Sequence, residues 1–250
     1  MMTITAKLLG PAALLLAASL CSSQCLADYE QGDIIVRVGW GYVDPDDDSD
    51  WLQIDRTSEL PDTRLYVDTG DSATFTGTWL FADHFGLGIL AALPFEHDLE
   101  VAGLPDLDGG QLGRVDLGSI EHLPPTVTIQ WFPVCQESWV QPYVGLGVNF
   151  TTFRDEKISD VANEYFHDVL DASSSASLHL DDSWGLAGEL GIDIAFGPDS
   201  NWLVNAAVWY LDIDAEANIS FRTFEGYRTR ISTDVDIDPW VYSLGIGYKF

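Results

Sequence analysis

The sequence predicts an all-β protein, folded as an eight-stranded antiparallel transmembrane β-barrel of the bacterial outer membrane. Three observations lead to this prediction. Apolar and small side chains alternate over segments of about ten residues, aromatic residues lie towards the ends of the apolar faces, and long connections alternate with short ones. A tilted strand needs about ten residues to cross a bilayer, whereas strands of soluble proteins average about five or six.

Eight segments carry the alternation. In chain order, their large apolar residues run from Val36 to Tyr42, Phe75 to Phe81, Leu87 to Phe95, Val127 to Trp131, Val144 to Phe150, Trp184 to Phe196, Val204 to Tyr210 and Trp240 to Phe250. The residues between them are mostly Gly, Ala, Ser and Thr. We expect the apolar face to contact lipid and the small face to line a narrow lumen, because a soluble sandwich would carry many charges on its second face. Pairing of the last strand with the first leaves no unpaired edge in the membrane.

The connections between these strands set the orientation. The long ones span residues 44–71, 98–117, 154–181 and 214–233, and the short ones span 82–84, 133–139 and 197–201. Long outer loops and short periplasmic turns are typical of outer-membrane barrels, so both ends of the barrel are expected in the periplasm. Within the third long loop, residues 159–170 form either a short helix or a plain ordered loop.

The N-terminus has the pattern of a secretory signal peptide. An apolar run from Leu8 to Leu20 follows Lys7, and small or neutral residues precede Asp28. We therefore predict that residues 1–27 are a cleaved signal peptide and that residues 28–250 form the barrel. The last strand ends at Phe250, where we expect recognition by the outer-membrane assembly machinery.

The charge balance excludes one class of partner. The chain has 11 basic and 40 acidic residues, a net charge of −29, so we expect no binding to nucleic acid. Most acids lie in the long loops. The run DPDDDSD (44–50) either binds a divalent cation or belongs to a solvated acidic rim. It lacks the Gly and the terminal Glu of an ordered calcium loop, so we predict no specific metal site.

No catalytic chemistry is evident in the sequence. The five histidines are scattered, and none lies at a metal-binding spacing from Cys or another His. Neither a nucleophile elbow nor a phosphate-binding loop is present. We therefore predict no catalytic residues, no cofactor and no enzymatic activity.

Strand parity places charged residues inside the barrel. Arg37, Glu189, Asp193 and Lys249 all lie on lumen-facing positions. Charges in a narrow interior need partners, so a salt-bridge cluster near the periplasmic end is one interpretation. Separate solvation by water is the other.

Large apolar residues share the same inward parity. They are Leu90, Phe153, Trp209 and Leu211. A water-filled porin would not favour them. They either line a path for a hydrophobic solute or fill the core of a small barrel.

Six segments are distinctive in sequence and order: GILAALPFEHDL (88–99), HLPPT (122–126), QPYVGLGVNFTTF (141–153), DSWGLAGELGID (182–193), NWLVNAAVWYLDID (201–214) and DPWVYSLGIGYKF (238–250). In these segments the chain resembles the OmpW family of outer-membrane proteins, which includes AlkL-like members. The resemblance implies an apolar lumen that passes small hydrophobic molecules, with Leu90 and Trp209 at the constriction. His97 and His122 also fit the pattern, with no role implied. The long and acidic first loop departs from it.

The function expected from these features is a passive, porin-like channel of a Gram-negative outer membrane. A small hydrophobic solute would enter the outer lumen, pass Leu90 and Trp209, and leave sideways into membrane lipid. The Gly-rich strands would either ease that opening or relieve crowding inside the barrel. The alternatives are a structural or surface-interaction barrel, whose acidic loops bind cations or partners, and a small cation channel.

Overall fold

The computed structural model of the chain describes residues 29–197 and 199–250. The predicted signal peptide, residues 1–27, lies outside the described residues.

Eight antiparallel strands close into a barrel, as the alternation predicted. In spatial order they are β10 (Thr126–Trp131), β7 (Phe85–Ala92), β6 (Gly70–Ala82), β1 (Ile34–Asp44), β17 (Trp240–Lys249), β14 (Trp202–Leu211), β13 (Ser183–Phe196) and β11 (Val140–Ile158). Pairing of β10 with β11 completes the ring. The last strand lies against the first along its whole length, from Ile35 opposite Lys249 to Asp44 opposite Trp240.

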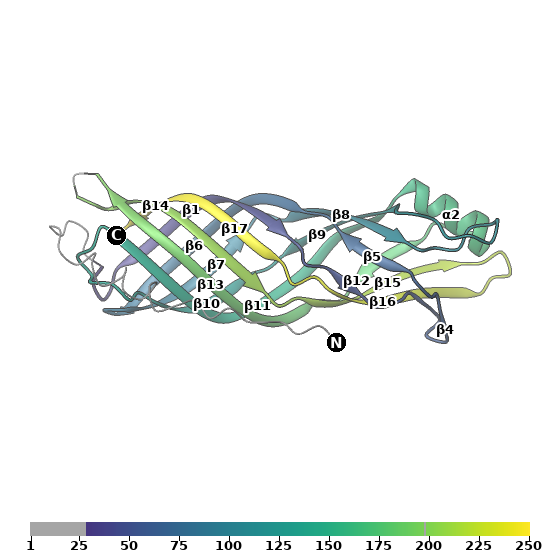
Figure 1. The fold of residues 1–250 in the computed structure, drawn as a ribbon, viewed down its shortest axis with the longest axis horizontal. Coiled ribbons are helices and arrows are strands. Elements are labelled where there is room, and N and C mark those ends of the chain that lie inside the picture. The colour runs from purple at the N-terminus through teal and green to yellow at the C-terminus, as the bar shows by residue number, and fades with distance from the viewer. Residues whose placement is uncertain (1–28, 198) are drawn as a thin grey trace, which may run out of the picture.

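The barrel continues beyond the membrane on one side. There β8 (Phe95–Ala102), β9 (Val115–Leu123) and β5 (Arg64–Val67) extend the sheet from the far half of β11. A second sheet contains β12 (Ser177–Leu180), β15 (Asp214–Arg222), β16 (Arg228–Asp236), β2 (Asp48–Ser49), β3 (Gln53–Ile54) and β4 (Ser58–Glu59). Figure 1 shows these elements at the opposite end of the molecule from the C-terminus. The four long connections are therefore mostly folded, and we name this part the outer extension.

Residues Asp160–Leu170 form helix α2, so the helical alternative for this loop is confirmed. The Ser159 side chain caps the N-terminus by accepting a hydrogen bond from the Ala162 backbone N–H. Ala162 and Phe166 bury one side of the helix. Within the described residues, no helix combines the length and the hydropathy needed to cross a bilayer.

The strand faces differ in the way that the sequence predicted. Large apolar side chains point out, as at Val38 (52% exposed), Leu190 (61%) and Ile246 (55%). These positions belong to a lipid-facing belt. Its outer rim carries Trp40, Tyr42, Trp184 and Trp240, and its periplasmic rim carries Trp79, Phe196, Trp202 and Phe250.

The predicted end of the third strand is wrong. Its lipid-facing residues were expected to continue to Phe95, but β7 ends at Ala92 and β8 begins at Phe95. Pro94 lies in the break, where its lack of an N–H leaves no ladder hydrogen bond to donate. The alternation changes phase there, so Phe95 is 1% exposed and stacks on His122 inside the molecule.

The β1–β17 seam depends on glycine. Gly39 and Gly245 lie opposite each other. A Cβ atom added to Gly245 would lie 2.5 Å from the Val38 carbonyl oxygen, and one added to Gly39 would lie 2.7 Å from that of Leu244. This close approach agrees with the relief of crowding as the role of these glycines.

We predict that Gly245→Val prevents closure of the seam, because the added side chain meets the backbone of Val38 and Gly39 on the facing strand β1. The fraction of protein that migrates as the compact, folded form after refolding into detergent micelles should fall sharply. Gly113→Val is the matched control, since nothing lies within 4 Å of its Cβ position. Equal folded fractions for the two variants would contradict this role of the seam.

Candidate functional site

The outer half of the lumen is a continuous apolar core. Leu90 of β7, Phe153 of β11, and Trp209 and Leu211 of β14 all lie inside it, with exposed fractions of 3%, 8%, 1% and 0%. The same cluster continues through the outer extension to Phe166 of α2. The structure thus brings the four apolar residues selected by parity into one cluster.

The periplasmic half of the lumen is polar. Arg37 of β1 and Asp193 of β13 form a two-pronged ion pair that is almost fully buried. Arg37 also donates to the Thr78 hydroxyl at 2.9 Å. Asp193 accepts hydrogen bonds from Asn205 Nδ2 at 2.8 Å and from the Tyr29 hydroxyl at 3.1 Å. These additional bonds compensate for the loss of water around both charges.

Glu189 joins this network through uncharged side chains. Its Oε2 atom accepts hydrogen bonds from Thr128 Oγ1 at 3.1 Å and from Gln130 Nε2 at 2.8 Å. Gln130 in turn accepts a hydrogen bond from Thr78, which contacts Arg37. The path from the ion pair to Glu189 therefore runs through two neutral residues.

Lys249 lies at the periplasmic end of β17. Its Nζ atom is 3.5 Å from Asp33 Oδ2 and lies over the ring of Tyr29. Parity placed all four charges inside correctly. Of the four, Arg37 and Asp193 pair directly, whereas Glu189 is linked to them through neutral side chains and Lys249 contacts Asp33 from the segment before β1.

A second apolar cluster closes the periplasmic end. Its members are Tyr29, Ile35, Leu80, Phe132, Tyr143, Ala195 and Leu203. The ring of Phe132 lies 5.6 Å from that of Tyr29 and 5.3 Å from that of Tyr143. Tyr29 precedes the first strand and shows no alternation with its neighbours, so sequence reasoning had no signal for its place in this seal.

The lipid-facing surface has an apolar groove of about 830 Å³ over β13, β14 and β17. Its lining is Trp40, Tyr42, Pro142, Leu190, Gly191, Ile192, Ala206, Ala207, Val208, Tyr242, Ser243 and Leu244. Gly191, Ala207 and Ser243 alternate with the lipid-facing residues of their strands, so the wall behind the groove carries small side chains.

Two histidines stack where the outer extension meets the barrel. The ring of His97 on β8 lies 4.7 Å from that of His122 on β9, and Phe95 packs on His122. The Nδ1 atom of His97 is 2.6 Å from the Asp68 carbonyl oxygen, so the neutral ring donates there. Burial lowers the pKa of both rings from the ordinary value, and in His122 the neighbouring His97 lowers it further.

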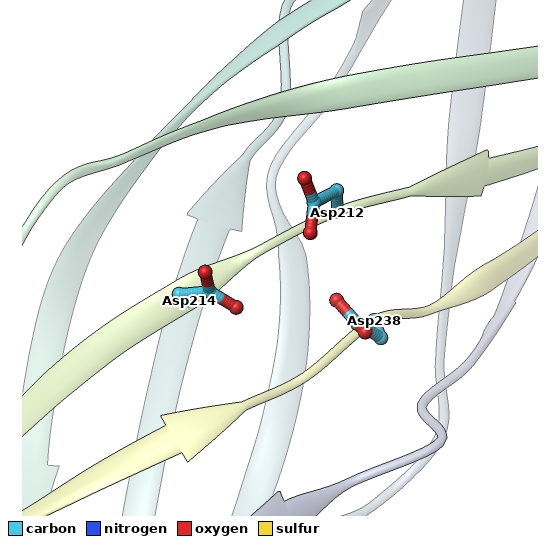
Figure 2. A group of neighbouring side chains, drawn as sticks. All are labelled: Asp212, Asp214 and Asp238. Atoms are coloured by element: carbon cyan, nitrogen blue, oxygen red, sulfur yellow. The ribbon is translucent and has the colours of Figure 1, made fainter.

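One acidic group has the arrangement of cation ligands. Figure 2 shows Asp212 on the link from β14 to β15, Asp214 at the start of β15, and Asp238 on the link from β16 to β17. One carboxylate oxygen from each lies within 4.8 Å of the others, which makes them the only such group in residues 29–197 and 199–250. Burial and neighbouring carboxylates, including Asp236, raise the pKa of Asp214. The Tyr210 hydroxyl and the Ile213 backbone N–H donate to Asp238.

The acidic run 44–50 thus does not supply the carboxylates of this group. Asp212 and Asp214 follow one barrel strand, and Asp238 precedes its neighbour. Acids that flank two adjacent strands on the same side of the membrane must meet. That signal was available in the sequence once the strand order was known.

Comparison with known proteins gives consistent matches. Residues 30–250 match the family model described as OmpW family. Outer membrane protein W of Vibrio cholerae serotype O1 is 36% identical over 234 residues, which are 93% of this chain and 95% of that protein. The crystal structure of OprG from Pseudomonas aeruginosa is similar with a TM-score of 0.76 and 40% identity, over 89% of this chain and 98% of that one. The solid-state NMR structure of AlkL in lipid bilayers, 20% identical with a TM-score of 0.55 over 90% and 92% of the two chains, shares the fold.

We predict that Arg37→Met lowers the free energy of unfolding by about 3–5 kcal/mol, because it leaves Asp193 as an unpaired buried carboxylate. The double variant Arg37→Met, Asp193→Leu should recover most of the loss. Urea unfolding of the refolded barrel, followed by gel mobility, measures both. Arg56→Met breaks the exposed pair with Glu216 and serves as the control that should change little. A double variant no more stable than the single one would contradict this account.

Acidification should destabilise the outer extension through His97 and His122. Above pH of about 6.5 the rings are neutral in both the folded and unfolded states, so they add no pH dependence. Below that value the unfolded chain binds protons that the folded protein resists, because burial lowers the folded pKa of each ring. The melting temperature should therefore fall between pH 7 and pH 5, and His122→Phe should weaken this dependence. Phe95→Leu removes packing on the same ring and should keep the wild-type pH dependence. Identical slopes in the wild type and His122→Phe would refute the assignment.

Proposed function

The chain belongs to the OmpW family of outer-membrane barrels, and from this premise we propose that it is a passive channel for small hydrophobic molecules. It is an outer-membrane protein, and the family is not an enzyme family. The solute enters from outside, passes through the apolar half of the lumen, and leaves sideways into membrane lipid.

The observation that carries this proposal is that the barrel interior is divided into an apolar outer half and a polar, sealed periplasmic half. Apolar side chains fill the lumen from the outer extension down to Leu90 and Trp209. Below them lie the buried Arg37–Asp193 pair and the apolar seal around Tyr29 and Phe132. A hydrophobic solute is stabilised in the first section and obstructed by the second. We assign Phe153, Leu211, Leu90 and Trp209 to its path.

Lateral release has support from the wall of the barrel. The lipid-facing groove of about 830 Å³ lies over the same strands, β13 and β14, whose inner faces carry Glu189 and Trp209. The wall there includes Gly191 and Ala207, and the ring of Tyr143 covers Gly191 on its inner side, so the solute would have to displace that ring to cross. We propose that the solute crosses the wall here and enters the acyl chains of the membrane.

The proposal also covers how the protein itself reaches the outer membrane. Residues 1–27 would be removed as a signal peptide after Ala27, and the last strand would be read by the assembly machinery through Phe250. Tyr29, two positions beyond the proposed cleavage site, already bonds Asp193 inside the barrel end. This placement favours a mature chain that begins close to residue 28.

Uptake of a radiolabelled medium-chain alkane by cells tests the function. Cells with the wild-type protein should take up the alkane faster than cells without it, and Trp209→Arg should abolish the gain because it places a charge in the apolar path. Leu90→Ala should raise uptake by widening the constriction. Trp51→Arg, an exposed site in the outer extension, is the matched control that should act as wild type.

Each variant must first be present in folded form in the outer membrane, as judged by gel mobility. If cells with folded wild-type protein take up the alkane no faster than cells without the protein, the channel is refuted. Equal uptake by the wild type and Trp209→Arg would refute this lumen as the route.

A further inference from the structure

The apolar half of the lumen contains polar atoms without hydrogen-bond partners. They are both amide atoms of Asn149, the Thr151 hydroxyl, the Trp209 indole nitrogen, and the Nε2 atoms of His97 and His122. Each of these side chains belongs to a residue that is at most 3% exposed. Buried polar atoms in proteins are nearly always paired, so five such residues in one section of the lumen call for a ligand.

These residues line connected parts of the wall. Asn149, Thr151 and Phe153 follow one another on the inner face of β11, and His122 lies directly opposite Phe153 on β9. Trp209 is on β14, with only β13 between it and β11. On the inner face of β13, Gly185 lies opposite Asn149 and Glu189 lies opposite Trp209, with only Ala187 between these two positions.

The available atoms match a small uncharged group. Asn149 offers both a donor and an acceptor, Thr151 can serve as either, and Trp209 donates. His97 donates Nδ1–H to the Asp68 carbonyl and leaves Nε2 as an acceptor. A hydroxyl group, which donates and accepts at once, satisfies more of these atoms than a carbonyl or an ether.

The surrounding charges disfavour an ionised group. Arg37 is neutralised by Asp193 in the periplasmic half. Glu189, the charged residue nearest to Trp209 along the strand pair, is an acid. An anionic head would therefore have no cation to pair with. The Glu189 carboxylate already accepts hydrogen bonds from Thr128 and Gln130, so an ammonium group would have to compete with these two side chains.

We propose that the preferred solute is a medium-chain hydrocarbon that carries one hydroxyl group, bound with that group between Asn149 and Thr151 and within reach of the Trp209 indole. This inference rests on the proposed function, because it names the chemical class of the solute that the same lumen takes. The hydrocarbon chain lies against Leu90, Phe153 and Leu211.

Binding of 1-decanol and n-decane to the wild-type protein in lipid nanodiscs tests the inference. Both probes are compared at equal mole fraction in the lipid, and binding is followed by NMR of the Trp209 indole N–H, assigned with Trp209→Phe. Decanol should bind about tenfold more tightly than decane, since it gains two neutral hydrogen bonds. The double variant Asn149→Leu, Thr151→Val should remove this preference by weakening decanol alone.

Two further variants keep the test decisive. Thr151→Ser retains the hydroxyl and should retain the preference for decanol. Thr152→Val changes the neighbouring residue on the other face of β11 and should behave as the wild type. If the double variant does not fold, Thr151→Val alone should lose part of the preference.

The outcomes separate this inference from the function on which it rests. If neither probe binds the wild type, the hydrophobic channel itself is refuted. If both bind equally, or if the double variant loses both equally, only the hydroxyl preference is overturned. A double variant with a higher melting temperature and unchanged affinities would show that the polar atoms bind buried water, which also overturns it.

Discussion

Complete pairing of backbone hydrogen bonds within the membrane is the constraint on which the rest of this structure depends. Lipid offers no partner for an exposed N–H or C=O group, so the sheet has to close on itself. Closure here brings β1 and β17 together at the Gly39–Gly245 contact. With eight strands, the ring is narrow and its interior is filled by side chains. The small residues of the inner faces follow from closure and not from any requirement of transport.

That narrow interior determines where polarity can be placed. Arg37 and Asp193 are stable at the periplasmic end because Thr78, Asn205 and Tyr29 complete their hydrogen bonds. The outer half is apolar and joins the core of the outer extension without interruption. One barrel therefore contains a polar plug and an apolar chamber in series. The long connections fold as strands because the chamber would otherwise expose its side chains to water.

The sequence allowed the barrel to be predicted because period-two alternation is a local property. Each strand, each inward charge and the inward position of Trp209 followed from parity alone. Parity failed at Pro94, where a break of the ladder moved Phe95 from the lipid face to the interior. It also could not show which inward residues touch, since contacts depend on the stagger between strands. The Asp33–Lys249 contact and the His97–His122 stack could not be predicted for that reason.

The same stagger explains why unpaired polar atoms collect in the apolar chamber. In the periplasmic half, Thr128, Gln130 and Glu189 meet across three neighbouring strands and satisfy one another. Further out, Asn149 lies between Gly185 and Thr126, whose hydroxyl donates to the Pro124 carbonyl, and Trp209 lies between Glu189 and Val241. None of these neighbours forms a hydrogen bond with the Asn149 amide or the Trp209 indole. A chamber that served only as filler would gain stability by replacing Asn149 with Leu, so its polar groups are better explained by a solute with a polar group of its own.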